Sequence, residues 1–169
     1  MRTASGRCAV FLLAVALGLS PILAGCTQQA PTFNLNEGWI RQSKSAIRQE
    51  TGEFSVLEYA KHPQGATLVL MWRRMLQKHF ENKFSAVVPL LAMSFGAKVN
   101  TVSEPAWTRI GDRKVLFATA EYPKKFFFYG FYENDTMYIL MGIVDPPLNA
   151  GRAMRFKSEL ESTLVNFKP

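Results

Sequence analysis

The side chain best placed for covalent chemistry is Cys26, which ends the sequence Leu-Ala-Gly-Cys at residues 23–26. A leader precedes it, with Arg2 and Arg7 ahead of a short apolar run. A basic segment, a short apolar segment and a small-residue cleavage site are typical of a secretory signal. The run is too short for a membrane-spanning helix, which needs roughly 20 apolar residues. The sequence therefore predicts an exported chain with a cysteine at the cleavage site.

Residues 23–26 resemble the lipobox of bacterial lipoproteins, whose Leu-Ala-Gly-Cys form they share. The resemblance implies cleavage between Gly25 and Cys26, removal of residues 1–25 and a lipid on Cys26. Two or three acyl chains on one cysteine give a firm anchor, because each buried methylene contributes about 0.8 kcal/mol. Thr27 follows Cys26, and the absence of an aspartate there favours the outer membrane, on its periplasmic side, in a cell with two membranes.

Residues 26–32 then form a lipidated tether, and residues 33–169 are long enough for one domain with a substantial core. A hydrophobic content of 48% favours a folded chain over a disordered one. The only other cysteine, Cys8, leaves with the leader. We therefore expect no disulfide, no thiol nucleophile and no cofactor.

Basic residues are the candidate interaction surface of a chain whose formal net charge is +7. They fall into two groups in the sequence, Arg73, Arg74, Lys78 and Lys83 in the first and Lys124 and Lys125 in the second. Their functional interpretation is contact with anionic lipid headgroups or an acidic partner. The ordinary interpretation is a solvated surface, with the lysine pair protecting an apolar strand against aggregation. Nucleic acid is not an expected partner, because the predicted location is extracytoplasmic and the sequence has no recognisable nucleic-acid-binding motif.

Two histidines, His62 and His79, are the candidates for a catalytic site. His79 lies two residues from Glu81, and residues two apart on a helix do not face each other. The sequence has no Gly-x-Ser-x-Gly elbow, no His-x-x-x-His pair and no acidic calcium loop. We therefore expect no metal site and no catalytic residues.

The elements of the first half follow from hydrophobic spacing. Residues 33–39 alternate and end in a turn, and residues 54–61 and 66–72 are expected strands on either side of a Pro-Gln-Gly turn. Residues 74–95 show helical spacing, which Pro89 should kink or divide into two helices. Gly96 is the expected stop.

Four further strands are expected in the second half, at residues 98–110, 113–122, 125–133 and 136–144. Their two-residue connectors are too short for crossovers and predict an antiparallel meander. The last two strands are apolar on both faces, so both faces of the sheet need a cover. A final helix capped by Asn149 provides the second layer. The fold class is therefore α/β (α+β), a three-layer α/β/α sandwich with a mainly antiparallel sheet.

The start of the domain, Phe-Asn-Leu-Asn-Glu-Gly-Trp at residues 33–39, resembles the start of PsbP-like and Mog1-like domains. The order of a central helix, an antiparallel meander and a terminal helix is also similar. Asn36 replaces the proline that is common before the Glu-Gly-Trp, and Pro89 interrupts the central helix. The resemblance implies a fold used mostly for protein binding and complex assembly.

These patterns favour a lipid-anchored envelope protein that acts as a non-catalytic interaction or assembly factor, with the membrane and an envelope protein as partners. One alternative is a protein that binds a small apolar ligand or lipid, in a cavity lined by some of Phe126, Phe128, Met137 and Met141. Another is an envelope hydrolase, with His62 or His79 within hydrogen-bond reach of a serine and a carboxylate.

Overall fold

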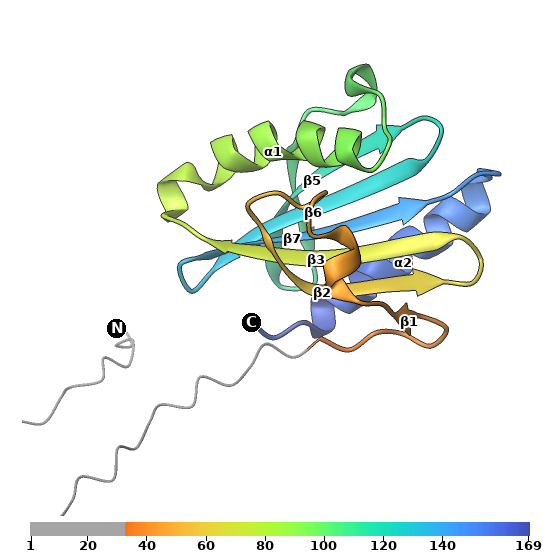
Figure 1. Cartoon of the computed structure of the whole chain (residues 1–169). Coiled ribbons are helices and arrows are strands. Elements are labelled where there is room, and N and C mark those ends of the chain that lie inside the picture. Colours follow the sequence, from red (N-terminus) through yellow and green to blue (C-terminus); the bar gives the residue numbers. More distant parts are fainter. Residues whose placement is uncertain (1–32) are drawn as a thin grey trace, which may run out of the picture.

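The computed structural model describes residues 33–169, which form a mixed α/β domain around a seven-stranded sheet (Figure 1). Its strands are β1 (Ile40–Arg41), β2 (Ser55–His62), β3 (Ala66–Arg74), β4 (Ala106–Ile110), β5 (Arg113–Glu121), β6 (Lys125–Glu133) and β7 (Thr136–Val144). Its helices are α1 (Phe80–Ser94) and α2 (Ala150–Asn166), with short 3₁₀ turns at Lys44–Ile47, Gln77–His79 and Val99–Thr101. The predicted leader, the Gly25–Cys26 cleavage site and the tether lie outside the described residues.

All neighbouring strands in the sheet are antiparallel, in the order β1-β2-β3-β7-β6-β5-β4. The last four strands form the predicted meander, which confirms a mixed α/β fold with an antiparallel sheet. β7 then lies beside β3, and the two pair over nine residues from Ala66↔Val144 to Arg74↔Thr136. This long pairing joins the β2–β3 hairpin to the meander.

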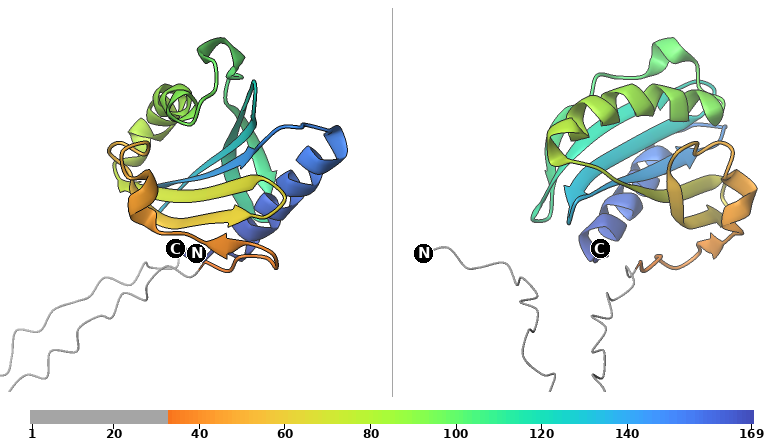
Figure 2. Two further views of the ribbon diagram at one scale, coloured as in Figure 1. Left: turned by 45° about the vertical axis from the view of Figure 1, so that its right-hand side comes forward. Right: turned by 60° about the vertical axis from the view of Figure 1, so that its left-hand side comes forward.

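Each face of the sheet packs against one helix, because side chains alternate between the two faces of a strand (Figure 2). On β6, Phe126 and Phe128 belong to the cluster that contains α1. Phe127 and Tyr129 belong to the cluster that contains α2. β7 is buried along its whole length. The two apolar faces expected from the sequence are thus both covered.

Two strand glycines let the helices approach the sheet closely. Gly130 on β6 faces Phe84 of α1, and Gly142 on β7 faces Leu160 of α2. A Cβ atom at either glycine would overlap the side chain opposite it. Each helix therefore packs one large side chain where the sheet has none.

A half-buried hydrogen bond also joins the sheet to α2. The Tyr129 hydroxyl donates to Glu161 Oε1 at 3.2 Å. Burial, with a further contribution from the Glu161 carboxylate, holds the pKa of Tyr129 far above its usual value near 10. Tyr129 consequently stays protonated in the folded chain at alkaline pH.

The region before α1 differs from its prediction. Residues 74–95 were expected to be helical, but β3 extends to Arg74 and α1 begins at Phe80. The Met75 N–H donates to the Asp135 carbonyl at 3.1 Å, which continues the pairing with β7. α1 also runs through Pro89 without dividing, and ends before Gly96, whose φ is +93°.

One expected strand is shorter than predicted, and the alternating N-terminal segment forms no strand. The strand expected at residues 98–110 is confined to Ala106–Ile110, and a 3₁₀ turn precedes it. The alternating residues 33–39 form no strand, and Phe33, Leu35 and Trp39 pack against the cluster that contains α2. The expected strands at 125–133 and 136–144 are confirmed to the residue, and Asn149 accepts a hydrogen bond from the Arg152 N–H at 2.7 Å.

We expect Gly130→Ala and Gly142→Ala each to lower the free energy of unfolding by about 1–3 kcal/mol, because the added methyl overpacks the core. Urea titration followed by circular dichroism measures the change. Gly151→Ala in α2 is the matched control, because its Cβ would meet only Asn149 Oδ1, at 3.7 Å. That variant should be unchanged or up to about 1 kcal/mol more stable. Equal midpoints for all three variants would contradict the close approach.

We expect stability to fall as the pH rises above about 10, by up to about 1.4 kcal/mol per pH unit from Tyr129. The unfolded chain releases the Tyr129 proton there, whereas the folded chain retains it. Tyr129→Phe should make this alkaline slope shallower, and Tyr122→Phe, at an exposed position, should not. Urea titrations at a series of alkaline pH values test this, and an unchanged slope in Tyr129→Phe refutes it.

Candidate functional site

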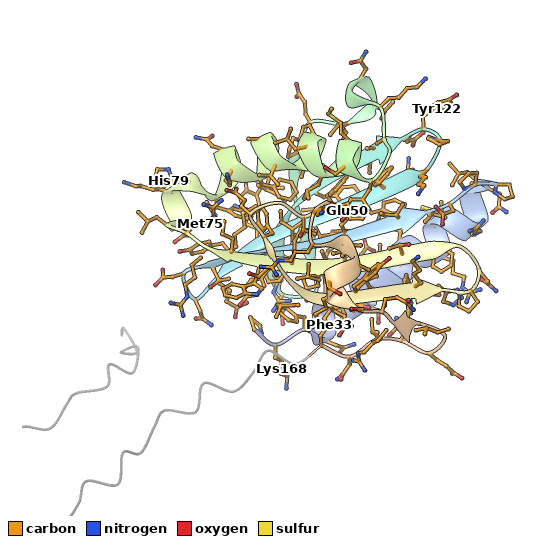
Figure 3. All side chains as sticks on the ribbon, in the orientation of Figure 1. Phe33, Glu50, Met75, His79, Tyr122 and Lys168 are labelled. Atoms are coloured by element: carbon orange, nitrogen blue, oxygen red, sulfur yellow. The ribbon has the colours of Figure 1, made fainter. Side chains whose placement is uncertain are left out.

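Phe33, the first described residue, packs next to the C-terminus of the domain. The Phe33 ring packs edge-on against Phe167 at 5.9 Å, and the Phe33 carbonyl accepts a hydrogen bond from Arg41 at 3.1 Å. Phe167 in turn packs on Tyr138 at 5.3 Å. Figure 3 shows Phe33 and Lys168 close together at the lower side of the domain. The described chain therefore begins beside the point where it ends.

Tyr138 shows which end of the sheet lies nearest to Phe33, the residue that the predicted tether would precede. It pairs with Trp72, two residues before Arg74 at the end of β3. We call this end of the sheet, formed by Arg74, Glu133 and Thr136, the tether end. The opposite end is formed by Ala66, Lys125 and Val144.

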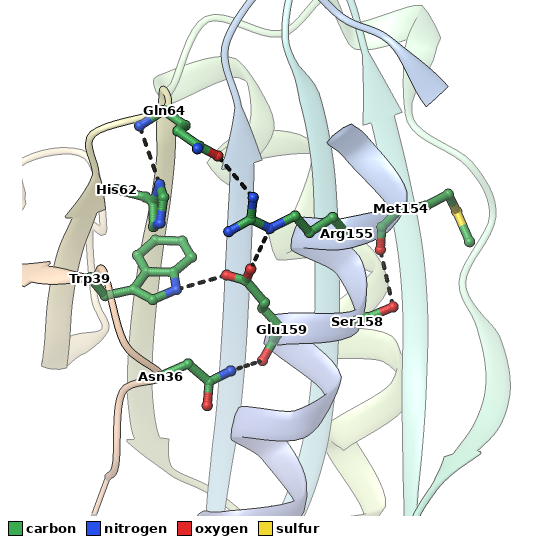
Figure 4. Close-up of polar contacts among 8 residues, drawn as sticks. All are labelled: Asn36, Trp39, His62, Gln64, Met154, Arg155, Ser158 and Glu159. Atoms are coloured by element: carbon green, nitrogen blue, oxygen red, sulfur yellow. Dashed lines mark hydrogen bonds and ion pairs between the residues drawn. The ribbon is translucent and has the colours of Figure 1, made fainter. Parts of the chain in front are cut away.

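A polar clamp fixes residues 33–39 to α2 (Figure 4). The indole Nε1 of Trp39 donates to Glu159 Oε2 at 3.1 Å, and the Asn36 side-chain amide donates to the Glu159 carbonyl at 3.3 Å. Arg155 donates to the other carboxylate oxygen of Glu159 at 3.0 Å, and to Gln64 at 3.2 Å. The clamp thus connects the N-terminal segment, α2 and the β2–β3 turn.

His62 belongs to the aromatic part of the clamp. Its ring lies edge-on to Trp39 and Phe156, with ring centres 5.5 and 5.1 Å away. Its Nδ1 accepts a hydrogen bond from the Gln64 N–H at 3.2 Å. Gly38 passes so close that a Cβ there would lie 2.7 Å from His62 Nε2, and its φ is +91°. Only glycine suits that position, which accounts physically for the Gly38-Trp39 pair.

The structure places the two histidines away from catalytic partners and the predicted cavity residues in the packed core. Among residues 33–169, neither His62 nor His79 shares a hydrogen bond with a serine or a carboxylate, and His79 is exposed. The four predicted cavity residues are fully buried in the cluster that contains α1: Phe126, Phe128, Met137 and Met141. The described part of the chain also brings together no group of histidines and acids able to hold a metal, and none of its helices has the length and apolarity to cross a membrane.

The six basic candidates do not form one surface. Four residues, Arg73, Arg74, Lys78 and Lys83, lie at or near the tether end, whereas Lys124 and Lys125 lie at the opposite end. Glu53 forms ion pairs with both Arg73 and Lys83. Lys124 pairs with Asp145 at 3.3 Å, and Lys125 with Glu121. Of the six candidates, only Arg74 and Lys78 form no ion pair within residues 33–169, so these two are the most available to a partner.

Glu159 is a structurally important residue that the sequence did not reveal. It lies 120 residues from Trp39, and on α2 it has the ordinary appearance of an i,i+4 partner for Arg155. Leu76 lies in the range predicted to be an amphipathic helix, residues 74–95, but it precedes α1 and its side chain is 60% exposed. The contact of Glu159 with Trp39 had no signal in the sequence. The exposure of Leu76 did have a signal in the sequence, because basic residues flank it on both sides.

No known family model matches the chain, and no curated protein matches its sequence. Among solved structures, a protein from Bacteroides thetaiotaomicron VPI-5482 is similar over 82% of this chain and 44% of its own. The TM-score is 0.49 and the sequence identity is 8%. The chain thus spans less than half the length of that protein.

We expect Trp39→Phe to lower the free energy of unfolding by about 1–2 kcal/mol, because Glu159 loses a partner in a half-buried site. Amide exchange in residues 33–39 should also become faster, since the segment loses its side-chain bond to α2. Trp107→Phe is the matched control, because that indole donates to Glu81 at an exposed site. If the two variants have the same stability and the same exchange in residues 33–39, the clamp does not hold the segment.

Proposed function

We propose that this chain is a lipid-anchored protein of the bacterial cell envelope, attached through Cys26 after removal of residues 1–25. The observation that carries the proposal is the Leu-Ala-Gly-Cys sequence after a basic and apolar leader. Thr27 after Cys26 favours the outer membrane, with the domain in the periplasm.

The domain, in this proposal, is a three-layer α/β/α sandwich of the PsbP-like or Mog1-like type. The positions of α1 and α2 on opposite faces of an antiparallel sheet support it. The N-terminal Gly38-Trp39 pair supports it as well, since it locks the segment before β1 against α2. Its role is to bind an envelope protein and assist assembly, without catalysis. The use of His62 and Glu159 in packing and clamping favours this role over a hydrolase.

Cys26→Ser should abolish acylation, retain the leader and remove the mass of the acyl chains from the purified protein. Cys8→Ser should mature normally, because Cys8 lies within the leader. Intact mass spectrometry of protein extracted from membranes distinguishes the two. Acylation that persists in Cys26→Ser, or mature protein without acyl groups in the unmodified chain, would refute the anchor.

The assembly role is tested separately, by affinity capture from detergent-solubilised envelopes with the native chain and with Cys26→Ser. One reproducible protein partner, lost in Cys26→Ser, would support a membrane-localised assembly factor. A bound lipid without a protein partner would contradict it and favour a ligand carrier.

A further inference from the structure

The loop from Arg74 to His79, which we call the basic loop, exposes a leucine among basic side chains. Leu76 is 60% exposed, and Arg74, Lys78 and His79 around it are exposed as well. An apolar side chain flanked by cations suits the headgroup region of an anionic bilayer, where the cations meet phosphates and the apolar group leaves water. The basic loop therefore has the chemistry of a lipid contact.

The basic loop is held rigidly at both ends. The Met75 N–H donates to the Asp135 carbonyl at 3.1 Å, and the Met75 carbonyl lies 2.9 Å from the Tyr132 hydroxyl. At the other end Phe80 is 3% exposed and belongs to the cluster that contains α1. Figure 3 shows Met75 and His79 at the two ends of the link between β3 and α1. Leu76 is thus presented outward by a fixed backbone.

Among residues 33–169 no acid forms an ion pair with Arg74 or Lys78, and the carboxylates nearest to the basic loop bond other side chains. Glu81 accepts from Trp107 at 2.8 Å, and Glu133 bonds Arg113 at 3.4 Å. The Asp135 carboxylate lies 3.0 Å from the Tyr132 hydroxyl. Glu53 is shared by two other basic residues. The charges of Arg74 and Lys78 consequently remain available.

The position of the loop favours a membrane as the partner. Arg74 is two residues along β3 from the Trp72–Tyr138 pair on which Phe167 packs, and Phe167 contacts Phe33. Two strand residues span about 7 Å. Residues 27–32 between Cys26 and Phe33 reach roughly 25 Å even when fully extended. A domain of this size has a radius of gyration of about 14 Å and is wider than that reach, so a lipid at Cys26 keeps the tether end close to the bilayer.

From this placement, and resting on the proposed anchor at Cys26, we propose that the basic loop docks on the anionic surface of the membrane that carries the anchor. Leu76 enters the headgroup region, and Arg74 and Lys78 face lipid phosphates. The docking sets the orientation of the anchored domain. The opposite end of the sheet, with Lys124 and Lys125, then points away from the bilayer.

Lysine footprinting on the full, membrane-extracted chain tests the docking. The protein is placed in vesicles of phosphatidylcholine, with or without phosphatidylglycerol, and acetylated with a water-soluble reagent. We expect Lys78 to react at least about fivefold more slowly on the anionic vesicles, the factor that corresponds to about 1 kcal/mol for one basic residue at such a surface. The exposed Lys61 and Lys98 are internal controls, and high salt should restore the reactivity of Lys78.

Leu76→Ser should restore much of the reactivity of Lys78, whereas Leu90→Ser, at a similarly exposed leucine of α1, should not. Equal reactivity of Lys78 and Lys98 on anionic vesicles would overturn the docking. Equal protection of Lys78 on neutral vesicles would also overturn it, because tethering alone would then explain the protection. Intact mass reports acylation of Cys26 separately. If acyl groups are missing, coupling Cys26 to a maleimide lipid restores the tether, and the same footprint is read.

Discussion

The burial of β7 is the constraint on which this domain depends. Every residue of β7 is buried, and its side chains point alternately to both faces of the sheet. Neither face can remain in water, because each exposes a continuous apolar surface. One helix therefore covers each face, and the glycines opposite Phe84 and Leu160 allow both helices to pack closely. The order of the strands follows, since β7 needs β3 on one side and β6 on the other.

The sequence predicts best where hydrophobic pattern and turn chemistry agree. β6 and β7 were predicted to the residue, because a two-residue connector joins two runs of apolar residues. The predicted start of α1 was wrong, because Met75, Leu76 and Phe80 happen to have helical spacing although the helix begins only at Phe80. Hydrogen bonds from β3 to a strand more than 60 residues away outweigh that local pattern. Such long-range pairing has no local signal.

The site was less predictable than the fold, because its partners are distant in sequence. Six basic residues have similar charge in the sequence, but Glu53 engages two of them and the sheet separates two others. Trp39 was recognised as part of a motif, yet its partner Glu159 lies on the last helix. The sequence pattern alone shows where residues of one chemical type, such as the basic residues, occur along the chain. Only the topology shows which of them share a surface and which are already neutralised.

The clamp between Trp39 and Glu159 has a mechanical consequence. Tension applied through residue 33 reaches the clamp before it reaches the sheet, because Asn36 and Trp39 are bonded to α2. β1 pairs with β2 over only two residues and would unzip under such a load. The clamp instead transfers the force to a helix that is packed along the sheet by Phe156, Leu160 and Leu164. The clamp thus lets the domain resist pulling from its N-terminal side.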